Sequence, residues 1–120
     1  MSKKILIIDD EPDFVDMIQM RLEANGYTIV SAEDGIQGVD VAIEEAPDLI
    51  LLDVMMPGWD GYETLKQLRR KPEVAKTPVI MLTAKGESRS IFKAQEMGST
   101  DYLIKPCEAK ELLETVAKHV

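Results

Sequence analysis

Three uninterrupted apolar runs constrain the fold of this chain more than any other feature. Residues 5–8, 49–52 and 79–82 read Ile-Leu-Ile-Ile, Leu-Ile-Leu-Leu and Val-Ile-Met-Leu. A strand exposed on one face alternates polar and apolar residues, whereas a strand covered by helices on both faces has no polar positions. The runs therefore predict three central strands. Residues 27–30 and 102–104 are apolar but more mixed, which predicts two strands at the edges of the sheet.

The segments between these runs carry apolar residues three and four positions apart, as amphipathic helices do. Five such stripes are present: Phe14, Ile18, Leu22; Ile36, Val39, Ile43; Tyr62, Leu65, Leu68; Ile91, Ala94, Met97; and Leu112, Leu113, Val116, Ala117, Val120. Pro12 suits the first turn of a helix and Gly26 a helix end, while Asp34-Gly35 and Asp60-Gly61 are typical of turns. The pattern predicts one helix after each strand.

The strict alternation of strand and helix determines the fold class. Parallel strands need crossover connections, and these connections are right-handed and place helices on both faces of the sheet. We therefore predict an α/β fold with a doubly wound parallel sheet. The five units account for residues 1–120, so we expect a single domain.

Composition and charge exclude several classes of function. The chain is 45% hydrophobic and 30% charged, as soluble globular proteins are, and its formal net charge is -8. An acidic surface repels nucleic acid, so we expect no direct nucleic-acid binding by this chain. One cysteine makes no internal disulfide, and no apolar stretch approaches the roughly 20 residues that a membrane-spanning helix needs. We expect a cytoplasmic protein without membrane contacts.

Polar side chains follow the predicted strands at the points where the strands end. Asp9 and Asp10 come directly after the first strand, Asp53 after the third, Thr83 after the fourth and Lys105 after the fifth. The carboxyl ends of parallel strands meet at one edge of the sheet, where ligands of open α/β folds bind. We therefore expect these five side chains to lie close together.

This set of side chains has the chemistry of a phosphoryl-transfer site. Neighbouring carboxylates raise one another's pKa unless a cation neutralises them, and carboxylate oxygens suit a hard ion such as Mg²⁺. Zinc is disfavoured because no His or Cys lies in these motifs. An amine supplies fixed positive charge and a hydroxyl supplies a donor, and phosphoryl transfer requires both beside a metal.

Each of these residues alone has a simpler structural explanation. A single Asp at a strand end usually caps a helix or a turn, and a Lys before Pro is usually a surface residue. The functional interpretation depends on all of them falling at the ends of strands that were placed independently.

The sequence also resembles the receiver domains of response regulators, the CheY-like family of two-component signal transduction. The resemblance extends over almost the whole chain and implies a flavodoxin-like sheet of strand order 2-1-3-4-5. The motifs that carry it are Ile7-Ile8-Asp9-Asp10-Glu11-Pro12, Leu51-Leu52-Asp53-Val54-Met55-Met56-Pro57-Gly58, Met81-Leu82-Thr83-Ala84 and Gly98-Ser99-Thr100-Asp101-Tyr102-Leu103-Ile104-Lys105-Pro106.

The resemblance implies an acceptor and a metal site. Asp53 would take a phosphoryl group from a phosphohistidine. Asp10, Asp53 and the backbone carbonyl of Met55 would bind Mg²⁺ directly, with Mn²⁺ as a possible substitute, and Asp9 would act mainly through a coordinated water.

The resemblance also implies a switch. Lys105 would pair with the phosphoryl group, Thr83 would move to hydrogen-bond it, and Tyr102 would turn inward when the threonine moves. The Lys105–Pro106 peptide is commonly cis in the family. Phosphorylation would thereby reshape the face formed by the fourth helix, the fifth strand and the fifth helix.

On this basis the chain is a regulatory switch and not an enzyme with a separate substrate, because it would catalyse only its own phosphorylation and dephosphorylation. Its phosphodonor would be a sensor histidine kinase or a histidine phosphotransfer protein. Its output would be a downstream protein target or a fused output domain. We expect a monomer, or a homodimer that forms on phosphorylation.

Two other functions are compatible with parts of the pattern. Phosphatases of the haloacid dehalogenase type also use an aspartyl nucleophile and Mg²⁺, but they carry a second Asp two residues later, where this chain has Met55. A pseudo-receiver that acts as a constitutive adaptor would lack one of the acids, the lysine or the threonine, and this chain has them all.

Two residues at the rim of the predicted site bear on the lifetime of the phosphorylated state. Met55 and Lys85 lie two residues after Asp53 and Thr83. Neither offers a carboxylate or amide to orient an attacking water, and Lys85 adds positive charge near the phosphoryl oxygens. We therefore expect slow self-dephosphorylation.

Overall fold

The computed structural model of the chain describes residues 2–84 and 88–120, and it describes the side chains of the second range from residue 92 onward. Strands and helices alternate throughout: β1 (Lys4–Ile8), α1 (Pro12–Ala24), β2 (Thr28–Ala32), α2 (Gly35–Glu45), β3 (Leu49–Asp53), α3 (Gly61–Arg70), β4 (Val79–Ala84), α4 (Ser88–Glu96), β5 (Asp101–Lys105) and α5 (Ala109–His119). Each strand is followed by one helix, as the sequence predicts.

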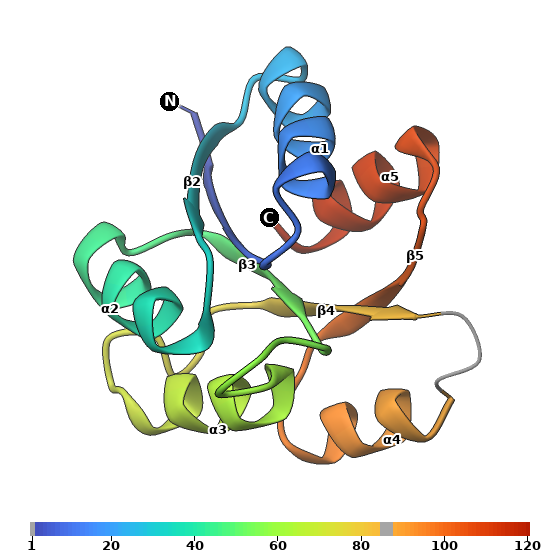
Figure 1. Cartoon of the computed structure of the whole chain (residues 1–120). Coiled ribbons are helices and arrows are strands. Elements are labelled where there is room, and N and C mark those ends of the chain that lie inside the picture. Colours follow the sequence, from blue (N-terminus) through green and yellow to red (C-terminus); the bar gives the residue numbers. More distant parts are fainter. Residues whose placement is uncertain (1, 85–87) are drawn as a thin grey trace.

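The strands form one parallel sheet in the order β2-β1-β3-β4-β5. Helices α1 and α5 cover one face, and α2, α3 and α4 cover the other (Figure 1). The predicted fold class and strand order are confirmed.

Alternating residues of the central strands belong to two separate hydrophobic cores. Ile5 and Ile7 of β1 face α1 and α5, whereas Leu6 and Ile8 face the helices on the other side. Side chains in the three predicted central runs are fully buried or almost so. Burial on both faces explains why these runs contain no polar residue.

The two weaker runs are the edge strands. Strand β2 is exposed at Thr28 and Ser31, and β5 is exposed at Tyr102 and Ile104. The structure shifts β2 relative to the predicted residues 27–30, because its register with β1 pairs Lys4 with Thr28 and Ile8 with Ala32. Hydrogen bonding to the neighbouring strand, and not apolar content, decides where β2 ends.

Two members of the predicted helical stripes face solvent, so those assignments were wrong. Ile36 is 56% exposed, because α2 begins at Gly35 and turns Gly38, Val39 and Ala42 toward the sheet. Gly38 lies so close to Ile8 that a methyl group would not fit. Ala117 of α5 is also exposed, and the predicted stripe member Ile91 lies outside the described side chains.

Across the described part of the chain, no helix has both the length and the apolar character to cross a membrane.

The start of α3 is packed directly against the end of β3. The Asp60 carboxylate caps the helix by accepting a hydrogen bond from the Glu63 amide, and the Gly61 amide donates to the Val54 carbonyl. A β-carbon at Gly61 would lie 2.5 Å from the backbone oxygen of Asp53. Only glycine permits this approach, which connects α3 rigidly to the residue at the end of β3.

We predict that Gly61→Ala lowers the free energy of unfolding by about 1–3 kcal/mol, because the added methyl group meets backbone atoms that cannot move aside independently. Urea denaturation measures this loss. Lys66→Ala on the exposed side of α3 is the control and should change stability by less than about 0.5 kcal/mol. Equal stability of Gly61→Ala and wild type would show that β3 and α3 can separate at little cost.

Candidate functional site

Three carboxylates converge beyond the ends of β1 and β3. Oxygen atoms of Asp9, Asp10 and Asp53 lie within 4.8 Å of one another. The side chains of Asp9 and Asp53 are buried, whereas Asp10 is exposed. The predicted convergence of these acids is therefore observed.

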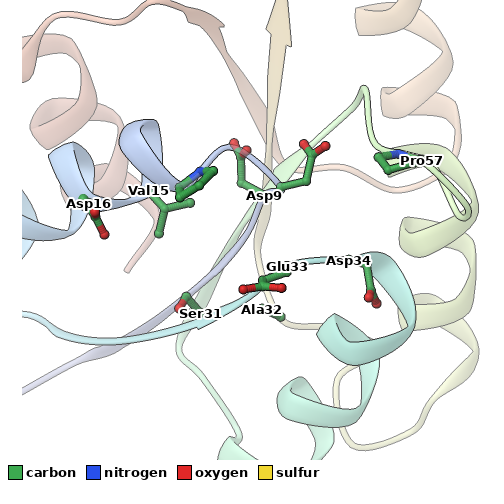
Figure 2. Close-up of a pocket in the computed structure, with 10 residues that line it drawn as sticks. Asp9, Val15, Asp16, Ser31, Ala32, Glu33, Asp34 and Pro57 are labelled. Atoms are coloured by element: carbon green, nitrogen blue, oxygen red, sulfur yellow. The ribbon is translucent and has the colours of Figure 1, made fainter.

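A cleft of about 450 Å³ opens beside Asp9 and Asp10. Its walls come from the loop after β1, the start of α1, the end of β2 with the loop that follows it, and Pro57 (Figure 2). Asp16, Glu33 and Asp34 add further carboxylates to the lining. None of these three residues was predicted as part of the site, because they lie outside the motifs at the ends of the central strands.

Lys105, at the end of β5, places its ammonium group among the acids. Its Nζ atom lies 2.8 Å from Asp9 Oδ2, 2.6 Å from Glu11 Oε1 and 3.4 Å from Asp53 Oδ1. The same nitrogen lies 4.4 Å from the centre of the Phe14 ring, within the range of a cation–π interaction. The contacts of Lys105 with Glu11 and Phe14 were not predicted from the sequence. The third consecutive acid after β1 was the available signal for Glu11.

The environment of Asp53 opposes its ionisation. Burial of the carboxyl group, together with the neighbouring charge of Asp9, raises the pKa of Asp53 from 3.8 to about 7. Lys105 and the Met55 amide act in the opposite direction. Burial also tends to lower the pKa of Lys105, but its bonds to Asp9 and Glu11 and the charges of Asp53 and Asp9 outweigh this and raise it. One ammonium group leaves the acids incompletely neutralised.

Backbone amides hold the buried carboxylates in place. The Glu11 amide donates to Asp9 Oδ1 at 2.9 Å, and the Met55 amide donates to Asp53 Oδ1 at 3.3 Å. The second oxygen of Asp53 is buried and has no hydrogen-bond partner among the described residues. A buried oxygen in this state is costly unless a ligand satisfies it. The acid cluster with this free oxygen fits a hard divalent cation.

Thr83 is placed beside Asp53 by the pairing of β3 with β4, in which Asp53 pairs with Leu82. Its side chain is buried, and within the described ranges its hydroxyl has no hydrogen-bond partner. Tyr102 of β5 pairs with Met81, which precedes Thr83 by two residues on β4, and the Tyr102 side chain is exposed. The Lys105–Pro106 peptide bond is cis. Of the two predicted rim residues, Met55 is exposed, and Lys85 lies outside the described residues.

Comparison with known proteins assigns this arrangement to a family. A sequence model described as the response regulator receiver domain matches residues 5–117. The chain belongs to the response regulator receiver domains. It is therefore a receiver domain of two-component signalling, and receiver domains are regulatory modules that interact with histidine kinases and output domains.

Solved receiver structures from three organisms superpose closely on this chain. Chemotaxis protein CheY4 of Vibrio cholerae is 29% identical with a TM-score of 0.95, and the match covers 100% of both chains. The receiver domain of sensor histidine kinase PA1611 from Pseudomonas aeruginosa is 30% identical with a TM-score of 0.90, covering 99% of this chain and 98% of that one. That structure holds a magnesium ion in its active-site cleft. A CheY-like receiver domain protein from Methanospirillum hungatei is 26% identical with a TM-score of 0.90, covering 98% and 93%.

We predict that metal-free Asp53→Asn is more stable than wild type at pH 7.5 and that this advantage shrinks toward pH 5. The folded protein keeps a proton on Asp53 up to a pKa of about 7, whereas the unfolded chain loses it near 3.8. The wild type therefore loses stability as pH rises between these values, and the variant does not. The difference at pH 7.5 should be about 1–3 kcal/mol.

Urea denaturation at both pH values, with a metal chelator present, measures this difference. Asp40→Asn removes the same charge from the exposed surface of α2 and should keep the pH dependence of the wild type. If Asp53→Asn is destabilising at both pH values, the buried carboxyl group is not a source of electrostatic strain.

Proposed function

We propose that this receiver domain is a phosphorylation-activated switch of a phosphorelay and that Asp53 accepts the phosphoryl group. The supporting observation is the Asp53 carboxylate itself. It is buried, lies 3.4 Å from the Lys105 ammonium, and has one oxygen that is not hydrogen-bonded within the described part of the chain. Its phosphodonor is a phosphohistidine on a sensor histidine kinase or a histidine phosphotransfer protein.

Mg²⁺ is the proposed cofactor. Asp10, Asp53 and the Met55 backbone carbonyl would hold it, and Asp9, whose carboxylate already pairs with Lys105, would contribute through water. When bound, the ion supplies positive charge to the acid cluster and to the oxygens of the phosphoryl group.

The chain's own residues perform the transfer as follows. An oxygen of Asp53 forms a bond to phosphorus, the bond between phosphorus and the donor's imidazole nitrogen breaks, and the nitrogen keeps the electron pair. The Lys105 ammonium stabilises the charge on the phosphoryl oxygens, and the Thr83 hydroxyl donates a hydrogen bond to one of them. Thr83 suits this task because its buried hydroxyl lacks a partner among the residues described.

The output surface is the face formed by α4, β5 and α5. Helix α4 and strand β5 carry three exposed large apolar side chains: Phe92 (68%), Tyr102 (37%) and Ile104 (38%). Movement of Thr83 toward the phosphoryl group would draw Tyr102 inward and change this surface. The partner is a downstream protein or a fused output domain, or a second copy of the chain, and not nucleic acid. The proposed site of action is the cytoplasm.

The alternative functions receive less support from the site. The side chain of Met55, which stands where a dehalogenase-type phosphatase has its second Asp, is exposed and apolar. Against a pseudo-receiver, the acids and Lys105 are clustered and Thr83 is adjacent to them. The slow self-dephosphorylation attributed to Met55 and Lys85 stays a prediction.

We predict that acetyl phosphate with Mg²⁺ phosphorylates wild type at Asp53 and leaves Asp53→Asn unmodified. Mass spectrometry of the intact protein and its peptides maps the adduct. Asp40→Asn serves as the matched control and should be phosphorylated like wild type. An equal yield of adduct on Asp53→Asn would overturn the assignment of the acceptor.

Metal binding can be followed in the same proteins through the only tryptophan, Trp59, which lies in the loop after Asp53. Because few protein ligands bind the ion directly, we expect a Mg²⁺ dissociation constant of about millimolar order. Asp10→Asn should remove saturable binding. Tight zinc binding at these acids would contradict the proposal.

We predict that Thr83→Ala binds beryllofluoride, a phosphoryl mimic, but no longer transmits binding to β5. In wild type, amide shifts should change near Asp53 and also around Tyr102. In Thr83→Ala only the changes near Asp53 should remain, because the hydroxyl that reaches the mimic is gone. Thr83→Ser keeps the hydroxyl and should restore the distant shifts. Distant shifts that persist in Thr83→Ala would show that another route couples the site to β5.

A further inference from the structure

Glu11 contacts Lys105 but has no part in the steps described above. It occupies the cap position of α1, yet its side chain makes no capping hydrogen bond. The carboxylate instead lies 2.6 Å from the ammonium of Lys105. The Glu11 carboxylate is therefore paired with Lys105 and not with the free amides of the first turn.

Lys105 is shared between carboxylates, and its contact with the phospho-acceptor is the longest. Its Nζ atom lies 2.8 Å from Asp9 and 2.6 Å from Glu11, but 3.4 Å from Asp53. An ammonium group has three N–H donors. Asp9 and Glu11 hold the two shorter contacts, so the amine is not fully available to a group on Asp53.

The two closer partners differ in how easily they can release the amine. The Asp9 side chain is fully buried, and its other oxygen accepts a hydrogen bond from the Glu11 amide at 2.9 Å. The Glu11 side chain is 60% exposed, so water can hydrate its carboxylate when it separates from Lys105. An ion pair with one exposed partner separates at less cost than a fully buried pair. Glu11 is therefore the partner that Lys105 can exchange.

We propose that Glu11 is the counter-ion of Lys105 in the unphosphorylated protein, and that Lys105 exchanges it for a phosphoryl oxygen when Asp53 is modified. The exchange breaks and forms no covalent bond. Glu11 is thus a positioning residue that acts through Lys105 and opposes phosphorylation. The inference rests on the proposed function of Asp53.

The first measurement is beryllofluoride binding in the presence of Mg²⁺, followed by the fluorescence of Trp59. In Glu11→Gln the half-saturating concentration should fall roughly two- to tenfold, the range expected when a charged competitor of a partly exposed pair is removed. Asp13→Asn is the matched control, because it removes the same charge from the exposed first turn of α1. It should bind beryllofluoride like wild type.

The second measurement needs neither metal nor phosphoryl mimic. The side-chain ammonium signal of Lys105 in a proton–nitrogen correlation spectrum is assigned by its loss in Lys105→Gln. In Glu11→Gln this signal should shift and exchange faster with water than in wild type. In Asp13→Asn it should be unchanged.

A third variant separates contact from charge. Glu11→Asp keeps the charge but is one methylene shorter, which should move its carboxylate out of direct contact with Lys105. It should bind beryllofluoride more tightly than wild type, as Glu11→Gln does. Weaker binding in Glu11→Gln, wild-type binding in Glu11→Asp, or an unchanged ammonium signal would each overturn the inference. Binding that persists in Asp53→Asn would instead overturn the proposed function.

Discussion

The ammonium of Lys105 lies among carboxylates from two other strand ends, and the site depends on this interaction. Asp9 and Asp53 are buried beside each other, which is costly for two negative charges. Lys105, at the end of the edge strand β5, offsets part of this repulsion. The remaining imbalance appears in the raised pKa of Asp53. Binding of a divalent cation here would add positive charge and so relieve a repulsion that is already present in the fold.

The sequence predicts the sheet and most of the site because both follow from local patterns. Burial on two faces allows only apolar residues, so the runs at 5–8, 49–52 and 79–82 show the central strands directly. The parallel arrangement then brings residues that follow different strands to one edge. Asp53 and Lys105, which are distant in the chain, lie 3.4 Å apart for this reason.

Features that depend on side-chain direction were not predictable in the same way. Ile36 has the spacing of a buried helical residue, but the start of α2 at Gly35 turns it to solvent. Glu11 follows the two site acids in the sequence, but only the folded sheet brings Lys105 within 2.6 Å of its carboxylate. In both cases the three-dimensional structure, and not the local sequence pattern, sets what the side chain meets. The elevated pKa of Asp53 likewise requires the burial that only the assembled sheet provides.

The division of the interior into two cores has a consequence for how the proposed output surface could change. Helix α4 packs through Ala94 into one core, and α5 packs through Leu112 and Val116 into the other. Strand β5 lies at the edge where these layers meet, as Figure 1 shows. The proposed output face therefore spans both sides of the sheet at this edge. Because α4 and α5 pack into different cores, a shift of α4 need not disturb the packing of Leu112 and Val116.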